Sequence, residues 1–198
     1  MSLTLNILHC ALLAVFLSCC APHADAEPAV EIGFSRDTAT GQEVIQATST
    51  FVQHGPSIRK VLLAINGYTA LHPWITGASL VKSSNQDPAE FLLEFKFPWP
   101  IGRRWSHIEV QQDGGGAIVW QQLAGNMGAN QGKLQFAARG RGLVVEYSAV
   151  ISLELPDILL RRFKKQFVIE FINAAYAQAA VENPTGLTLA TSTPYTRQ

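Results

Sequence analysis

The stretch LPDILLRRFKKQFVIEFINAAYAQAAVE, from Leu155 to Glu182, joins the end of a strand-rich region to a long helix. Pro156 has no backbone N–H to give to a sheet, so it favours the end of the preceding strand. Asp157 places a negative charge where the N-terminal dipole of a helix stabilises it. The sequence therefore predicts a helix of about 25 residues that begins near Asp157 and ends near Glu182.

The apolar side chains of this helix fall into two adjoining groups when residues are placed 100° apart. The first group is a compact stripe that would dock the helix on a sheet, formed by Leu160, Phe163, Phe167, Phe171 and Ala174. Val168, Ile172 and Ala175 widen the apolar arc beyond the roughly 100° that a one-sided contact needs. The helix therefore contacts something besides the sheet, which is a cavity, a covering loop or a second subunit.

The chain before this helix is dominated by short segments in which apolar and polar residues alternate, a pattern typical of antiparallel strands. The predicted strands are Val30–Phe34, Glu43–Val52, Ile75–Lys82, Ala89–Phe97, Arg103–Gln111, Ala117–Leu123, Gly132–Ala138 and Leu143–Leu153. Glycine-rich hairpin signals follow at Asp113–Gly116 and Gly140–Gly142. Between the strands at Glu43 and Ile75, Gly55-Pro56-Ser57 starts a short helix that ends at Asn66-Gly67, and Tyr68–Trp74 is a second short helical segment. This order predicts an α+β domain in which a curved antiparallel sheet is closed by the C-terminal helix.

Length and composition fit one globular domain over residues 27–182, followed by a loose tail at 183–198. The chain has 198 residues, of which 47% are hydrophobic and 15% are charged, and its formal net charge is zero. A neutral chain gives no general attraction to nucleic acid, so no nucleic-acid partner is expected.

The first 26 residues are interpreted as a signal peptide, which predicts export to the periplasm or the exterior. An apolar run from Ile7 to Leu17 precedes a small-residue cleavage site at Ala24-Asp25-Ala26. All three cysteines lie in this leader, at positions 10, 19 and 20, so cleavage would leave a chain without thiols. An alternative stays open, because Leu17-Ser18-Cys19 resembles the site at which bacterial lipoproteins are cleaved and acylated, which would anchor the protein to a membrane through Cys19.

Motifs for catalysis, metals and cofactors are not found in the sequence. His54, His72 and His107 are scattered and lack the paired spacing of a metal site. No nucleophile elbow and no phosphate-binding glycine loop occurs. No metal, no cofactor and no catalytic residue is therefore predicted.

The order of elements resembles the START-like, or SRPBCC, helix-grip superfamily, which includes lipid-transfer START domains, polyketide cyclases and coenzyme Q-binding proteins. Tyr68–Trp74 resembles a Tyr…Trp segment of the family, and Pro98–Arg104 resembles its Pro-rich turn before an arginine-bearing strand. Leu155-Pro156 resembles the entry to its closing helix. Trp105 stands where many START sequences have an acidic residue after the arginine, which leaves the role of that pair open here.

The resemblance implies a pocket between the sheet and the C-terminal helix that binds a lipid, an isoprenoid quinone or a similar hydrophobic molecule. The predicted pocket residues are Trp74, Phe95, Arg104, Ile108, Phe163, Phe167 and Phe171. Arg104 is chosen as the polar anchor because strand alternation places it with Ser106, Ile108 and Val110 on the more apolar face.

Two other functions and a second contact surface stay open at this level. An enzyme of the cyclase or dehydratase type would need an acid or base in the pocket, for which His107, Glu109 and Tyr147 are the candidates. An interaction domain would instead fill the pocket with its own Phe side chains. The basic run of the long helix either meets anionic lipid headgroups or is a solvated face, and it consists of Arg161, Arg162, Lys164 and Lys165.

Overall fold

The computed structural model describes residues 28–38, 40–83, 88–113, 116–140, 142–153 and 155–182. The predicted leader, its cysteines and cleavage site, and the tail at 183–198 lie outside the described residues. Parts of the two glycine hairpin turns, at 114–115 and 141, lie outside them as well.

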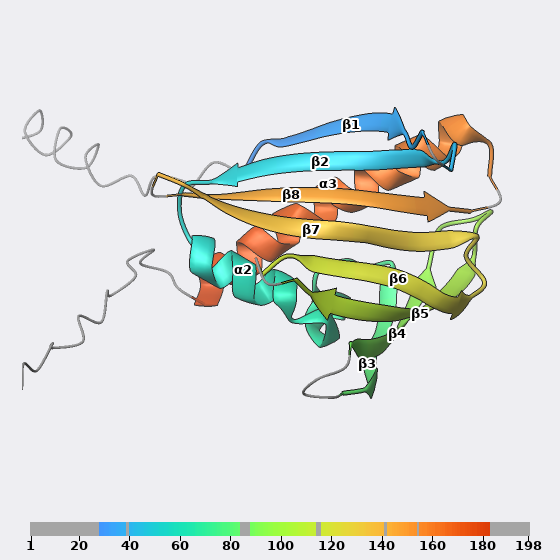
Figure 1. Ribbon diagram of the computed structural model, residues 1–198, viewed down its shortest axis with the longest axis horizontal. Coiled ribbons are helices and arrows are strands. Elements are labelled where there is room, and N and C mark those ends of the chain that lie inside the picture. Colours follow the sequence, from blue (N-terminus) through green and yellow to red (C-terminus); the bar gives the residue numbers. More distant parts are fainter. Residues whose placement is uncertain are drawn as a thin grey trace, which may run out of the picture.

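A single antiparallel sheet of eight strands forms the body of the domain, in the order β1-β2-β8-β7-β6-β5-β4-β3 (Figure 1). The strands are β1 (Val30–Arg36), β2 (Glu43–Phe51), β3 (Ile75–Lys82), β4 (Ala89–Lys96), β5 (Arg103–Gln112), β6 (Ile118–Gly125), β7 (Ala129–Arg139) and β8 (Gly142–Ser152). Every predicted strand is present, and the lead-in strand pairs with β2 along its whole length. From β3 to β8, strands that are consecutive in the sequence are also neighbours in the sheet.

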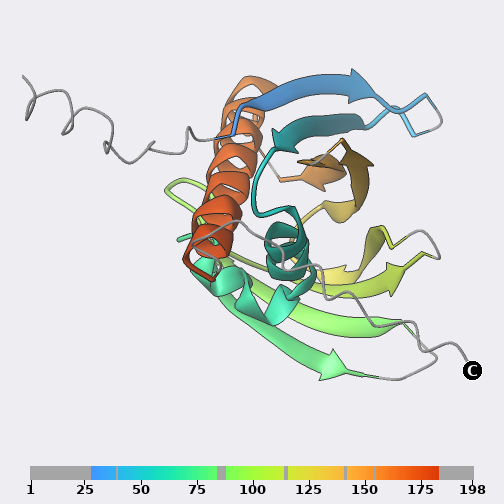
Figure 2. The same ribbon diagram turned by 90° about the vertical axis from the view of Figure 1, so that its left-hand side faces the viewer.

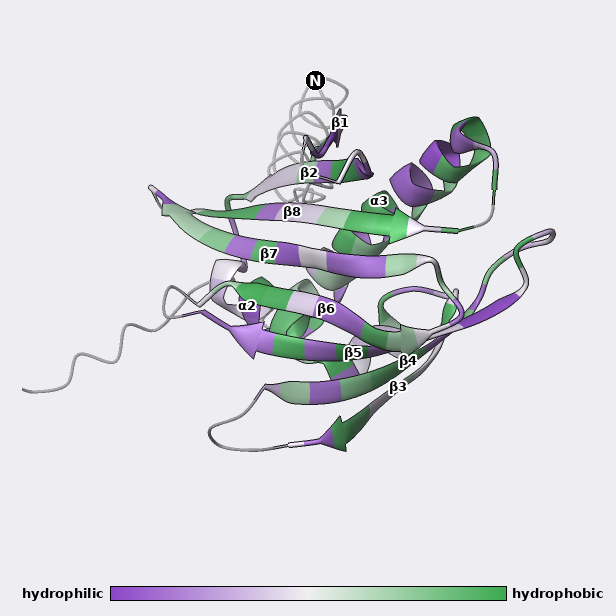
Figure 3. Ribbon diagram, turned by 45° about the vertical axis from the view of Figure 1, so that its right-hand side comes forward, coloured by the Kyte–Doolittle hydropathy of each residue, from purple (hydrophilic) through white to green (hydrophobic). Residues whose placement is uncertain are grey.

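Alternation along each strand determines which side of the sheet is buried (Figure 3). In β2, Ile45, Ala47, Ser49 and Phe51 are all buried, whereas the polar residues between them are exposed. Side chains of a strand point to opposite faces in turn, so one face of the sheet becomes the apolar concave face. The alternation that the sequence shows therefore predicts the correct face.

Two short helical segments follow β2, as expected, but their boundaries differ from the prediction. The first is α2 (Gly55–Leu63), with Pro56 in its first turn, where the missing N–H costs nothing. The second is the 3-10 helix η1 (Ile65–Ala70). Ala64 leaves the helical conformation, with φ −87° and ψ 74°, so the first helix ends at Leu63, three residues before the predicted end at Asn66. η1 begins three residues before the predicted segment Tyr68–Trp74 and ends at Ala70, within that segment.

The long helix α3 (Asp157–Glu182) stands across the open side of the curved sheet (Figure 2). Its most buried side chains are Leu160, Lys164, Val168, Phe171, Ile172, Ala175 and Ala179. The predicted docking stripe is confirmed at Leu160 and Phe171 but is wrong at Phe163, Phe167 and Ala174, which are only partly buried. Small and β-branched side chains let α3 approach its neighbours closely, as at Ala175 and Ala179, which are completely buried.

Candidate ligand cavity

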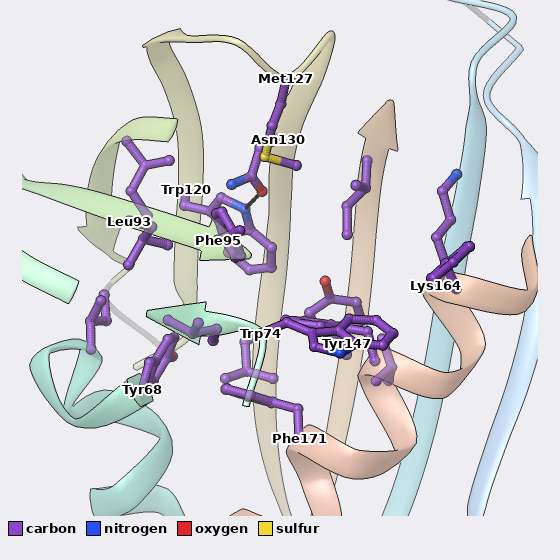
Figure 4. A pocket seen from close by; sticks show the side chains of 18 of the residues that line it. Tyr68, Trp74, Leu93, Phe95, Trp120, Met127, Asn130, Tyr147, Lys164 and Phe171 are labelled. Atoms are coloured by element: carbon purple, nitrogen blue, oxygen red, sulfur yellow. Dashed lines mark hydrogen bonds between the residues drawn. The ribbon is translucent and has the colours of Figure 1, made fainter. Parts of the chain in front are cut away.

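An apolar cavity of about 110 Å³ lies between α3 and the concave face of the sheet (Figure 4). Its walls come from the inner faces of β3 to β8, from α2 and η1, and from one side of α3. The lining residues are Leu62, Ile65, Tyr68, Trp74, Ile75, Leu93, Phe95, Phe97, Ile108, Val110, Ile118, Trp120, Met127, Asn130, Leu134, Tyr147, Ile151, Leu153, Leu160, Phe163, Lys164, Phe167, Val168, Phe171 and Ile172. A concave, mostly apolar space with a few polar groups is the usual form of a small-molecule site.

Aromatic rings close the cavity on the side where α3 faces β3 and β4. Trp74 lies just before β3, and its ring centroid is 5.8 Å from that of Phe97, the residue that follows β4. It is also 5.7 Å from Phe163 and 6.3 Å from Phe167, both on α3. We call these four residues the aromatic seam. All four residues are only partly buried. Their side chains form this wall of the cavity.

His72 supports the seam from behind. Its side chain is fully buried, and its ring centroid lies 4.5 Å from that of Phe167. The backbone N–H of Trp74 donates to Nδ1 of His72 at 3.1 Å, so a neutral ring carries its proton on Nε2, which lies 3.1 Å from a carboxylate oxygen of Glu170. Burial lowers the pKa of His72, and Glu170 opposes that shift. The neutral imidazole thus connects the segment before β3 to α3.

The polar groups that the sheet and η1 bring to the cavity are neutral. Nε1–H of Trp120 donates to the side-chain oxygen of Asn130 at 3.0 Å, and the amide of Asn130 donates to Ser106 at 3.2 Å. The hydroxyl of Tyr68 donates to the backbone oxygen of Leu62 at 2.7 Å. Burial raises the pKa of both Tyr68 and Tyr147, so both phenols stay protonated. These groups can offer hydrogen bonds to a ligand but no charge.

Lys164 is the exception, because its side chain carries an ammonium group. It is only 4% exposed and lines the cavity, and its Nζ is 3.3 Å from Oε1 of Glu43 on β2. The other carboxylate oxygen of Glu43 accepts a hydrogen bond from Nε of Arg161. The expectation that Lys164 belongs to an exposed basic surface is therefore wrong. The spacing from Leu160 to Lys164 to Val168, four residues each, places Lys164 in a buried row of α3.

Six of the seven predicted pocket residues line the cavity together: Trp74, Phe95, Ile108, Phe163, Phe167 and Phe171. Arg104 does not. It lies on the expected face of β5, but the pairing of β6 with β5 ends at Ser106, so Arg104 lies beyond that strand. Nη1 of Arg104 donates to the backbone oxygen of Arg103 at 3.0 Å, and both residues border a separate surface depression. A role for Arg104 in ligand binding stays a prediction.

The three acid or base candidates are separated by the sheet. His107 and Glu109 point away from the concave face, and Nε2 of His107 lies 2.9 Å from a carboxylate oxygen of Glu90. Tyr147 alone lines the cavity. No carboxylate and no imidazole is among the described residues that line it, and the described part of the chain holds no cluster of residues suited to a metal ion.

Some lining residues were not predicted from the sequence, notably Lys164, Asn130, Trp120 and Met127. Trp120 and Asn130 lie on β6 and β7, where the predicted strand positions were correct but no local motif marks a pocket. The four-residue spacing from Leu160 to Lys164 to Val168 is the sequence pattern that could have predicted the burial of Lys164.

Solved structures with the same fold share little sequence identity with this chain. A START superfamily protein from Mycobacterium smegmatis has a TM-score of 0.61 at 12% identity, covering 70% of this chain and 98% of that one. A STAR-related lipid transfer protein from Xanthomonas axonopodis has a TM-score of 0.55 at 18% identity, covering 80% and 94%. The Zhui aromatase/cyclase from Streptomyces sp. R1128 has a TM-score of 0.55 at 16% identity, covering 73% and 98%.

No protein-family model and no curated protein matches the sequence. The likeness to the solved structures shows that the chain has the START-like helix-grip fold, as the resemblance predicted.

Proposed function

From the START-like fold and its cavity, we propose that the protein is a carrier or sensor that binds a hydrophobic small molecule between the concave sheet and α3. The observation that carries this proposal is the cavity itself. A domain without a ligand would gain dispersion energy by filling this space with side chains, because protein interiors are close-packed. Structures with this fold include one titled as a lipid transfer protein and one titled as an aromatase/cyclase.

The size of the cavity limits the ligand that it can hold without rearrangement. An engineered apolar cavity of about 150 Å³ holds one benzene molecule. The present volume of about 110 Å³ suits a group of similar or smaller size. A longer ligand requires the rings of the aromatic seam to turn aside, and their partial exposure makes this wall the most easily displaced one.

A carrier fits the lining better than a cyclase or dehydratase does. Proton transfer in such an enzyme needs a group whose pKa lies near the working pH. Of the three acid or base candidates only Tyr147 reaches the cavity, and burial raises its pKa further from neutrality.

We also propose that the ligand enters and leaves at an anionic membrane surface. The turn between β4 and β5 lies at the same end of the molecule as the beginning of α3 (Figures 1 and 3). Trp99 in this turn is 91% exposed, and Ile158 on α3 is 80% exposed. Three basic side chains in the first turns of α3 are also exposed, namely Arg161, Arg162 and Lys165. An apolar tip beside positive charge suits a membrane interface. Within the residues that the structure describes, no helix is long and apolar enough to span a bilayer.

Calorimetric titration with 1-alkanols and with isoprenoid quinones tests the binding proposal. Saturable binding of one molecule per chain supports it, and no binding of any apolar compound would favour the interaction domain instead. Cosedimentation with vesicles that contain phosphatidylglycerol tests the membrane proposal. Trp99→Ala should weaken that association, whereas Trp105→Ala, on the outer face of the sheet, should not.

The first 26 residues are proposed to direct export of the protein. The alternative is a lipoprotein that is acylated at Cys19 and held at the membrane. The N-terminus of the mature protein distinguishes these two alternatives.

A further inference from the structure

Lys164 gives the cavity a charged position that a purely apolar ligand does not need. It is the only residue with a formal charge among the described residues that line the cavity. Its side chain rises from α3 beside β2, while the neutral polar groups lie across the sheet on β6, β7 and β8 (Figure 4). Removing an ammonium group from water costs several kcal/mol unless oxygen atoms replace its hydration. The position of Lys164 therefore requires an account of its partners.

Lys164 shares its carboxylate partner with a second basic side chain. Among the residues that the structure describes, Glu43 is the carboxylate paired with Lys164, and the same carboxylate is paired with Arg161. Two basic side chains thus share one carboxylate, and Lys164 is the buried one of the two, because the side chain of Arg161 is 55% exposed. An ammonium group has three N–H donors, and the hydrogen bond to Glu43 is the interaction that the structure shows for Lys164. Donors therefore remain for an oxygen atom that enters from the cavity.

We propose that the ligand is a single-chain amphiphile with a carboxylate head group, which binds Lys164 while its apolar part lies along the cavity. The head group would give the buried ammonium group of Lys164 a negative partner that it does not share with Arg161. The remainder of the lining provides apolar contacts, from Leu160 beside Lys164 to Phe171, which packs edge-on against Tyr68 at 4.9 Å. This inference rests on the proposed function, because it names the chemical class of the ligand in the same cavity.

The test compares fatty acids with 1-alkanols of the same chain length by calorimetric titration at neutral pH. The wild-type protein should bind the acid about 10-fold to 100-fold more tightly, as expected of a hydrogen bond to a charged group. Lys164→Met keeps the apolar stem and leaves Glu43 paired with Arg161, so the acid should lose this advantage while the alkanol binds as before. Lys164→Arg keeps the charge and should retain part of the preference.

Two matched variants separate a local effect from a general loss of charge. Lys60→Met removes one positive charge from α2, where Lys60 pairs with Glu182 on the surface, and should leave the preference intact. Arg104→Met should also leave it intact, because Arg104 lies outside the cavity. If Arg104→Met removes the preference and Lys164→Met does not, the head group binds beside Arg104 at the beginning of β5 and the inference is wrong.

The wild-type comparison alone decides the outcome if Lys164→Met does not fold. Equal affinities for acids and alkanols would overturn the assignment of a carboxylate ligand and leave the proposed hydrophobic-ligand function standing. No binding of either series would remove both proposals.

Discussion

Filling the cavity with a larger side chain tests whether it is usable space, and two valines make a matched pair for this purpose. Val110 on β5 lines the cavity and is 8% exposed. Val145 on β8 is completely buried and is not among the lining residues. Val→Phe adds about four carbons at either position, which gain about 0.8 kcal/mol each if they are buried without strain. Extra carbons forced into a packed core instead cost about 1–3 kcal/mol.

We therefore expect opposite results from the two substitutions. The ring of Val110→Phe enters space that is already empty. The free energy of unfolding of this variant should therefore fall by less than about 1 kcal/mol, or it should rise. Val145→Phe should lower the free energy of unfolding by about 1–3 kcal/mol, because the strain exceeds the gain from burial. Urea denaturation measures both values, provided that the slope of the transition does not change.

Ligand binding by the same two variants completes the experiment. Val110→Phe should lose 1-alkanol binding by at least about 10-fold, whereas Val145→Phe should bind as the wild type does. An equal loss of stability in both variants would mean that the space near Val110 is not usable. A stable Val110→Phe protein with full affinity would place the ligand elsewhere.

Three further predictions concern α3, pH and the N-terminus. Phe167→Asp should strongly destabilise the fold. Val168→Asp should destabilise it more, because Val168 is 2% exposed whereas Phe167 is only partly buried. The reverse order of urea midpoints would mean that α3 is rotated about its axis. Burial lowers the pKa of His72 below its ordinary 6.5, and Glu170 only partly opposes this shift. The neutral ring of His72 therefore makes its full contribution to the free energy of unfolding above pH 6.5. That contribution is lost as the pH falls through the lower pKa of the folded state. His72→Asn, which keeps an acceptor for the backbone N–H that follows, should therefore flatten the fall of the melting temperature between about pH 7 and about pH 5, and an unchanged pH profile would exclude this residue as the cause. N-terminal sequencing of the exported protein should begin at Glu27, and an acylated cysteine would establish the lipoprotein instead.

Strand alternation made the sheet largely predictable from the sequence. Ile45, Ala47, Ser49 and Phe51 share a buried face because a strand repeats every two residues, whatever it packs against. The same rule placed Arg104 on the correct face of β5. It could not say how far the neighbouring strand extends, and that length determines whether Arg104 lies over the cavity or beyond it.

The orientation of α3 was harder to predict because both of its apolar rows satisfy a helical period. The row of aromatic residues through Phe163 and Phe167 is the more hydrophobic, so it looked like the docking face. The row through Val168 and Ala175 packs more closely because its side chains are smaller, and a cavity can accept the rings on the other side. Helical periodicity gives the width of an apolar arc but not which part of it meets a cavity. The burial of Lys164 was missed for the same reason. A lysine between two apolar residues of one helical row usually extends its ammonium group into solvent.

Non-denaturing mass spectrometry tests the central claim, that the cavity holds an apolar ligand, most directly. Wild-type and Val110→Phe proteins would each be incubated with a bacterial membrane lipid extract, transferred to a volatile buffer and weighed intact, and the bound compounds would then be extracted and identified. We predict one bound molecule per wild-type chain and a strongly reduced load on Val110→Phe. Equal loads on the two proteins, or no bound molecule on the wild type, would contradict the account.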